Sequence, residues 1–221
     1  MKTNNRATRI LQKLQNTFQL PKWADSSEKP FRTLIRTVLS QATADKNTNR
    51  AFRNLSKKFS ITPEALAKAD VEEIEEAIRV AGLYRNKSRV IKNISSIILD
   101  QFDGSLDFIH SLPLEEARSK LMGLPGVGAK TADVVLLFCA GRPVIPIDTH
   151  VKRVSKRLGL ASSKSSYEEI REALQSHCPP QNYLSVHLLL ISLGRKYCKA
   201  IKPLCKPCPV NTLCPSKQIS D

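Results

Sequence analysis

The sequence predicts an all-α fold that is divided into two lobes. Apolar residues recur at helical spacing along most of the chain, in segments of roughly 10 to 17 residues that short polar or Gly/Pro-rich stretches connect. No clear alternation of apolar and polar residues between hairpin turns interrupts these segments, which argues against a sheet. Near residue 142 the segment GRPVIPID contains Pro143 and Pro146, which prevent a continuous helix. We therefore expect the boundary between the lobes there.

The first three predicted helices each have one apolar face. These faces consist of Ile10, Leu11, Leu14 and Phe18, of Leu34, Ile35, Val38 and Leu39, and of Phe52, Leu55 and Phe59. In the second helix Arg32 and Arg36 fall outside the apolar stripe, as expected for a helix with one buried side. A helix of this kind packs its stripe against other helices.

Capping residues predict where the next helices begin. Thr62 followed by Pro63 is typical of an N-cap and a first-turn proline. Asp70 with Glu73 three residues later matches a capping box that opens a helix through VEEIEEAIRVAG, which Gly82 closes. The next segment, NKSRVIKNISSIILDQF, has an apolar side made of Val90, Ile91, Ile94, Ile97 and Ile98.

A helix, a glycine-rich turn and a second helix follow. LEEARSKLM, residues 114–122, predicts the first helix, and the second begins near Ala129. The turn GLPGVG contains Gly123, Gly126 and Gly128, which allow positive φ and close backbone approach. The free N–H groups of the second helix point into this turn, an arrangement that binds phosphate. Within the second helix ADVVLLFCAG is apolar all round, which predicts the most buried helix.

The charge of the chain favours a polyanionic partner. Its 35 Lys and Arg residues outnumber 20 Asp and Glu residues, for a net charge of +15. Such a field attracts nucleic acid or anionic lipid. The longest apolar run, Val134–Ala140, is too short to cross a bilayer, and no secretory signal is recognisable, so we expect a cytoplasmic protein associated with the nucleoid and not with a membrane.

Several motifs in order resemble one family. LPGVGAKTADVV followed by VIPIDTHVKRV resembles the helix-hairpin-helix, Gly/Pro-rich loop and aspartate signature of DNA glycosylases, specifically the endonuclease III group. PFRTLIRTVLSQATADKN, AGLYRNKSRVI and the last quarter of the chain extend the resemblance. It implies a six-helix barrel lobe at residues 31–142, with the hairpin at 114–140, and an iron–sulfur cluster lobe formed by residues 1–30 and 143–221.

The resemblance assigns catalysis to Lys130 and Asp148. Lys130 lies at the start of the second hairpin helix, where the helix dipole and the apolar Val127 and Val134 favour its free amine. This amine would attack the sugar C1′, expel the base and form a Schiff base, and Asp148 would stabilise the developing positive charge. Taken alone, Lys130 could equally contact a phosphate, and Asp148 could cap a helix with Val151 at N3.

Four of the six cysteines lie close together near the C-terminus. Cys198, Cys205, Cys208 and Cys214 have the spacing C-x6-C-x2-C-x5-C. The spacing has only one of the paired knuckles usual for zinc and differs from the ferredoxin pattern. The resemblance to endonuclease III implies that the four thiolates bind a 4Fe–4S cluster. We expect the cluster to organise a DNA-binding loop without a role in bond breaking.

The resemblance also suggests residues that contact DNA. Gln41 is the candidate to fill the space of an extruded nucleotide, although an alternative match places Ala42 there. The other candidate contacts are Leu124, Gly126, Gly128, Thr131, His150, Lys199 and Lys202. Tyr84 and Lys87 in GLYRNK would either contact the DNA or brace the barrel.

The function implied is that of a bifunctional DNA glycosylase and AP lyase. It would act as a monomer on double-stranded DNA that contains a damaged base or an abasic site, removing oxidised pyrimidines and cleaving the strand by β-elimination. One alternative is a monofunctional mismatch glycosylase, in which water attacks. The other is a non-enzymatic DNA-binding protein with a redox-sensing cluster.

Overall fold

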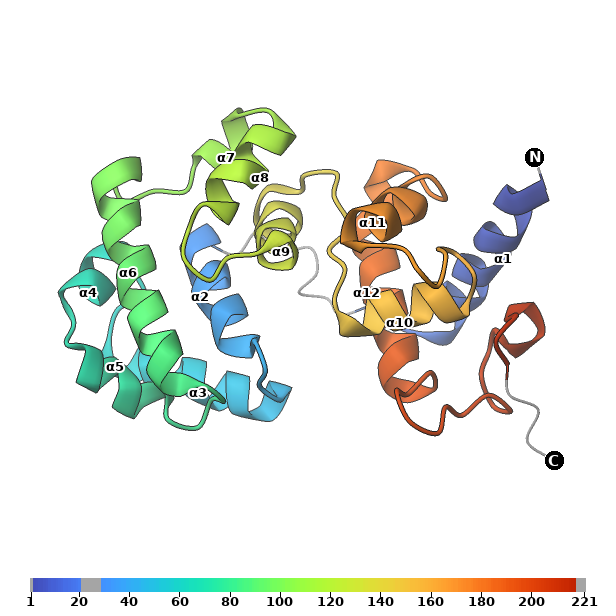
Figure 1. Cartoon of the computed structure of the whole chain (residues 1–221), viewed down its shortest axis with the longest axis horizontal. Helices are drawn as coiled ribbons and strands as arrows, with labels where there is room; N and C mark the ends of the chain where they lie inside the picture. The colour runs from blue at the N-terminus through green and yellow to red at the C-terminus, as the bar shows by residue number, and fades with distance from the viewer. Residues whose placement is uncertain (1, 21–28, 218–221) are drawn as a thin grey trace. The chain divides into compact units, whose positions relative to one another are not determined.

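The computed structural model describes residues 2–20 and 29–217 of the chain, and within these ranges all regular secondary structure is helical (Figure 1). The chain forms two compact units, Met1–Ser26 with Pro143–Asp221, and Ser27–Arg142. The division between Arg142 and Pro143 coincides with the prolines that interrupt the helical pattern. The other expected boundary, at residue 30, lies beside residues 21–28, which fall outside the described residues. No helix among the described residues is long and apolar enough to cross a membrane.

The unit Ser27–Arg142 contains helices α2 to α9. Among its described residues, six helices have eight or more residues, and α4 and α7 are shorter. The bounds are α2 Pro30–Ser40, α3 Asp45–Lys58, α4 Pro63–Lys68, α5 Val71–Ile78, α6 Tyr84–Phe102, α7 Phe108–Ser111, α8 Leu114–Met122 and α9 Ala129–Ala140. Helix α6 packs on α4 and α5, while α2 packs on α3 and α9. The two hairpin helices, α8 and α9, lie against each other.

Of the two caps predicted for the starts of α4 and α5, one is present. The Thr62 hydroxyl accepts a hydrogen bond from the backbone N–H of Ala65, as predicted for an N-cap. Asp70 occupies the N-cap of α5, but its side chain makes no capping hydrogen bond, so the predicted capping box is wrong. The Glu73 carboxylate instead lies 3.3 Å from Lys58 Nζ of α3. Helix α5 also ends before Gly82, at Ile78, so Gly82 does not terminate it.

A buried ion pair joins the hairpin helices. Arg118 of α8 donates from Nε to Oδ1 of Asp133 on α9 at 2.7 Å, and the Asp133 side chain is fully buried. The prediction that α9 is apolar all round is therefore wrong at Asp133, although α9 buries most of its residues. A carboxylate is tolerated inside because a guanidinium is positioned to pair with it.

The second unit is built around α12, Tyr183–Lys196. Helices α1, Lys2–Thr17, and α10, Thr149–Arg157, pack on it, and α11, Tyr167–Gln175, packs on α10. Ile10 and Leu14 of α1 are fully buried, as their apolar face predicts. Two short 3-10 turns, Pro180–Asn182 and Asn211–Leu213, complete the described secondary structure of this unit.

Candidate functional site

The hairpin turn between α8 and α9 exposes backbone donors. Of its three glycines only Gly126 uses a positive φ, +71°, whereas φ is −70° at Gly123 and −92° at Gly128. A Cβ on Gly128 would meet nothing within 4 Å. Among the hydrogen bonds of the described residues, none uses the backbone N–H of Gly126 or Gly128. The turn therefore offers two unpaired donors beside the N-terminus of α9, which suits an anion.

Lys130 follows this turn directly. It is the second residue of α9 and is partly exposed. Two neighbouring candidate DNA contacts have little exposed surface, Leu124 at 2% and Thr131 at 3%. Their side chains pack inside the hairpin, so a contact with DNA at these positions would involve backbone atoms. Within the turn itself Gly123, Gly126 and Gly128 are exposed.

Gln41 lies against the hairpin turn. Its side-chain Nε2 donates to the carbonyl oxygen of Gly126 at 3.0 Å and contacts Thr131 Oγ1 at 3.4 Å. Ala42, the alternative from the sequence, is exposed and has φ of +47°. The segment that follows α2 thus carries a polar side chain at the hairpin and a strained backbone next to it.

Lys87 is enclosed by the same turn. Its side chain is 3% exposed, and Nζ donates to Leu39 O at 2.9 Å, to Gln41 O at 2.5 Å and to Thr43 Oγ1 at 2.7 Å. Burial lowers the pKa of Lys87 to about 8. Of the two roles that the sequence left open for Lys87, the structure shows the bracing one.

Leu83 projects next to this braced turn. It is 65% exposed and has φ of 58°, a left-handed conformation that is rare for a leucine. The preceding residue, Gly82, donates its N–H to Thr43 Oγ1 at 3.1 Å. A Cβ on Gly82 would lie 2.6 Å from the carbonyl oxygen of Ala42, so only glycine fits. An exposed apolar side chain is thus attached to the turn that carries Gln41.

In the other unit, Asp148 caps α10. Its Oδ1 accepts a hydrogen bond from Val151 N at 2.7 Å, which confirms the predicted N-cap geometry. Among the described residues Asp148 makes no other side-chain hydrogen bond, so its second oxygen is available. His150 lies two residues further on, with Nδ1 3.1 Å from Arg153 Nη2 and Cβ close to Gly194 of α12. His150 thus packs within this unit.

Two arginines of α10 hold the segment that begins at Cys198. Arg153 Nε donates to Cys198 O at 2.9 Å. Arg157 donates from Nη1 to Lys199 O at 2.6 Å and from Nη2 to Ala200 O at 3.0 Å. The helix that carries Asp148 at its start therefore also fixes this loop. Lys199 and Lys202 on the loop are exposed, which suits contact with phosphate.

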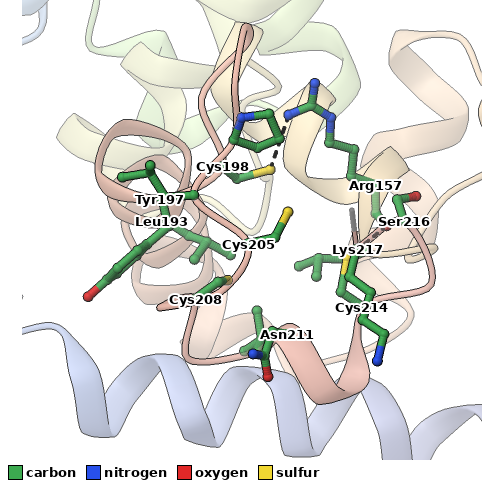
Figure 2. A pocket seen from close by; sticks show the side chains of 14 residues that line it. Arg157, Leu193, Tyr197, Cys198, Cys205, Cys208, Asn211, Cys214, Ser216 and Lys217 are labelled. Carbon is green, nitrogen blue, oxygen red and sulfur yellow. Dashed lines mark hydrogen bonds between the residues drawn. The ribbon is translucent and has the colours of Figure 1, made fainter. Parts of the chain in front are cut away.

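The four clustered cysteines line a single pocket at the end of α12 (Figure 2). Figure 2 shows Cys198, Cys205, Cys208 and Cys214 around this pocket, with Arg157 Nη1 reaching Cys198 Sγ at 3.5 Å. Burial raises the pKa of the Cys208 and Cys214 thiols. In the ranges that the structure describes, no three or more Cys, His, Asp or Glu side chains are arranged as a metal-binding group. The thiols share a pocket without forming a closed ligand set.

Comparison with known proteins identifies the family of this chain. Residues 35–180 match the family model described as HhH-GPD superfamily base excision DNA repair protein. Endonuclease III of Sulfolobus acidocaldarius is 40% identical over 185 residues, which are 83% of this chain and 81% of the relative. Endonuclease III of Escherichia coli is 35% identical over 219 residues, 98% of this chain and 99% of the relative. This chain belongs to the endonuclease III family.

Solved structures agree with this membership of the endonuclease III family. A trapped endonuclease III–DNA covalent intermediate, the estranged-adenine complex, is similar at a TM-score of 0.86 and 35% identity, with 98% of each chain covered. A thermostable thymine-DNA glycosylase has the same fold at a TM-score of 0.76 and 20% identity, covering 98% of this chain and 99% of that chain. The predicted all-α helix-hairpin-helix glycosylase fold is confirmed.

Sequence reasoning missed two features of this endonuclease III family member. The buried pair of Arg118 and Asp133 had a signal on one side only, because Asp133 is the one charged residue of ADVVLLFCAG, the segment predicted to be most buried, while nothing near Arg118 marks it as its partner. Leu83 had a detectable signal, because a large apolar residue directly after Gly82 and ahead of a polar segment has no place on the apolar stripe of α6. Within AGLYRNK only Tyr84 and Lys87 were considered as candidates for contacting the DNA or bracing the barrel.

Proposed function

We propose that this chain is a bifunctional DNA glycosylase and AP lyase of base excision repair, which removes oxidised pyrimidines from duplex DNA and then cleaves the strand. The observation that carries this proposal is the hairpin turn with its unpaired backbone donors directly ahead of Lys130. A phosphate bound by the N–H groups of Gly126 and Gly128 would hold the DNA backbone next to the nucleophile. Membership of the endonuclease III family supports the same assignment.

Lys130 supplies the nucleophile. Its neutral ε-amine attacks C1′ of the deoxyribose, and the bond to the base breaks as the base leaves with the electron pair and takes up a proton. The amine nitrogen loses its protons as the sugar ring opens to a Schiff base. Removal of a C2′ proton then expels the 3′ phosphate by β-elimination, and water releases the sugar fragment from Lys130. The positive end of the α9 dipole disfavours an ammonium at this position.

Asp148 stabilises the positive charge that develops on the sugar. One carboxylate oxygen caps α10 through Val151 N, and this bond fixes the orientation of the group. The other oxygen is then free to face the substrate. The structural and the catalytic interpretations of Asp148 are therefore compatible, because each uses a different oxygen.

Binding and distortion of the DNA are assigned to exposed groups of the two units. Lys199 and Lys202 contact phosphates. A base inside a duplex is out of reach, so the nucleotide must be extruded, at a cost of a few kcal/mol. Gln41 fills the vacated space, and Leu83 inserts as an apolar wedge between bases. The exposure of Leu83 and the fixed position of Gln41 support these roles.

The four clustered cysteines are assigned to a 4Fe–4S cluster. Cys198, Cys205, Cys208 and Cys214 supply four thiolate ligands from one largely apolar pocket, a donor set that suits iron–sulfur ligation. When bound, the cluster supplies a covalent anchor for the loop between Cys198 and Cys205. This loop presents Lys199 and Lys202, so the anchoring serves DNA binding.

Strand cleavage and covalent trapping test the proposal. We expect the wild type to nick duplexes that contain thymine glycol or an abasic site, and to form a borohydride-stable adduct with them. Lys130→Ala should form no adduct. A mismatch glycosylase would remove a base without trapping or nicking, and a DNA-binding protein without enzyme activity would leave both duplexes intact. An adduct of undiminished yield with Lys130→Ala would contradict the assignment of the nucleophile.

A further inference from the structure

We propose that Lys87 is a positioning residue that fixes the turn carrying Gln41, and so presents Gln41 and Leu83 to the DNA as one preformed assembly. This inference rests on the proposed function, since it concerns how the duplex is distorted. In this arrangement Lys87 holds the turn at residues 39–43 and does not itself contact the DNA.

The oxygens around Lys87 use the full donor capacity of its ammonium group. An ammonium has three N–H donors, and the three acceptors lie 2.5 to 2.9 Å from Nζ. Two are backbone carbonyls at the end of α2, Leu39 and Gln41, and the third is the Thr43 hydroxyl. Among the described residues Lys87 forms no ion pair, so neutral oxygens alone hold its charge. A phosphate would have to compete with all three.

The turn needs an external brace because some of its backbone carbonyls have no hydrogen-bond partner within the helix and one of its residues has a strained conformation. Helix α2 ends at Ser40, and the last carbonyls of a helix lack intrahelical partners. The left-handed backbone of Ala42 adds roughly 1–2 kcal/mol of strain. Lys87 reaches from α6 to Leu39 O and Gln41 O ahead of this bend and to Thr43 Oγ1 after it. It therefore compensates locally for a conformation that the turn would not hold alone.

The braced turn extends to Leu83 through a second set of contacts. Thr43 Oγ1 accepts from Lys87 Nζ and also from Gly82 N. The close approach of Gly82 to Ala42 O leaves no space for a side chain. Leu83 follows immediately, so its backbone is tied to the turn. Lys87 is thus central to one assembly with Gln41 at one side and Leu83 at the other.

The variant Lys87→Met removes the three donors and keeps a side chain of similar length. We expect single-turnover excision from duplex DNA to fall about tenfold, because a coupling of this size is typical for groups in one network. Strand cleavage at an abasic site in single-stranded DNA should fall less than about twofold, since no stack must be opened there. The fluorescence rise of a 2-aminopurine beside a non-cleavable abasic analogue should also shrink, which reports distortion independently of catalysis.

A double-mutant cycle shows whether Lys87 acts through the turn. In a Gln41→Ala background Lys87→Met should add much less than it does alone. Thr43→Ala removes one of the three acceptors of Lys87 at a partly exposed position, so it should show the same loss of duplex excision to a smaller extent. It tests the brace even if Lys87→Met fails to fold. Lys92→Met is the matched control, because Lys92 of α6 also donates to a backbone carbonyl, Ala69 O at 2.8 Å, outside the turn. The inference would be overturned if the losses of excision rate from Lys87→Met and Gln41→Ala were additive, or if Lys87→Met lost as much activity on single-stranded as on duplex DNA. Activity of the wild type would still support the proposed function in either case.

A second, independent observation concerns α3. We infer that a basic stripe on its exposed face binds the phosphate backbone of the DNA that flanks the lesion. The α3 stripe consists of Lys46, Arg50, Arg53 and Lys57. All four are exposed, and their spacing of four, three and four residues places them on one face, opposite the buried Thr48, Ala51 and Leu55. This inference also rests on the proposed function.

The charges of the α3 stripe are unpaired although acidic residues are near. Helix α5, which packs on α3, carries Glu73 and Glu76, and both pair with Lys58 at the side of α3. Among the described residues none of the four stripe cations forms an ion pair. The stripe spans about 16 Å along the helix, close to five steps of duplex DNA at about 3.4 Å each. A polyanion with regular charges fits it.

Salt dependence measures this binding. Replacing all four stripe residues by glutamine should reduce the magnitude of the slope of log K against log salt by about 3.6 for a long duplex with an abasic analogue, because each lost phosphate contact contributes about 0.9. A short duplex that ends near the lesion should show no such change. The control variant loses the same charge at exposed sites elsewhere, Arg9, Lys13, Lys68 and Lys164. Equal slopes for the stripe and control variants would overturn the inference, and retained cleavage of the short duplex would leave the proposed function intact.

Discussion

Gln41 Nε2 donates a hydrogen bond to the carbonyl oxygen of Gly126 at 3.0 Å, across 85 positions of sequence. This bond joins the turn after α2 to the hairpin turn ahead of Lys130. The group proposed to fill the space of the extruded nucleotide is therefore attached to the backbone proposed to hold a phosphate. In the proposed mechanism, distortion of the duplex and placement of the nucleophile therefore depend on the same small piece of structure.

Two glycines of the hairpin should respond differently to alanine. Gly128→Ala should leave the free energy of unfolding nearly unchanged, because φ is −92° and the space around a Cβ is open. It should weaken binding to duplex DNA, since the new methyl group stands where a phosphate would approach. Gly126→Ala should destabilise the protein by about 1–2 kcal/mol, because φ is +71° and a Cβ would lie 3.0 Å from Val90. Urea unfolding and DNA titration separate the two effects, and full DNA affinity of Gly128→Ala would argue against phosphate binding at this turn.

The ion pair between Arg118 and Asp133 should dominate the stability of the hairpin. Asp133→Ala should lower the free energy of unfolding by about 3–5 kcal/mol, because it leaves a buried guanidinium without its main partner. Glu115→Gln is the control, since the Glu115 carboxylate lies 3.8 Å from Arg118 but is largely exposed. Denaturant titration at neutral pH measures both. A loss below about 1 kcal/mol for Asp133→Ala would show that the pair is replaceable.

Asp148→Asn should separate capping from charge. Asparagine is as good an N-cap as aspartate, so α10 and the stability of the protein should be preserved. Base excision should fall by at least about a hundredfold, because a neutral amide does not stabilise a developing cation. Affinity for a non-cleavable abasic duplex should change little. If affinity and excision fell together, Asp148 would have a structural role only.

The ionisation of Lys87 should be visible in the pH dependence of stability. Its pKa is about 8 in the folded protein because of burial, below the ordinary 10.5 that applies to the unfolded chain. Between these two pKa values the unfolded chain binds more protons than the folded protein, so the contribution of Lys87 to the free energy of unfolding rises with pH. Below pH 8 Lys87 is protonated in both states, and the cost of burying its charge is fully present. The difference in stability between the wild type and Lys87→Met should therefore shift in favour of the wild type between about pH 7 and about pH 9.5. A constant difference would show that Lys87 ionises at its ordinary value.

Local chemistry was sufficient to predict several helix starts. The Thr62 cap, the start of α9 at Ala129 and the cap at Asp148 each depend on a few adjacent side chains, so their sequence patterns predict them directly. Local signals also gave errors where a distant group competed. Glu73 matched a capping box, but Lys58 of another helix takes its carboxylate.

The remaining features of the site exist only because distant segments meet. Lys87 becomes a brace when α6 brings it to the end of α2, and Asp133 becomes part of the core when α8 supplies Arg118. Leu124 and Thr131 are removed from the surface by the packing of the hairpin, which their sequence does not indicate. The sequence specifies helices and chemical groups through interactions within a few residues. The environment and accessibility of each group depend on contacts across tens of residues, which are established only by folding.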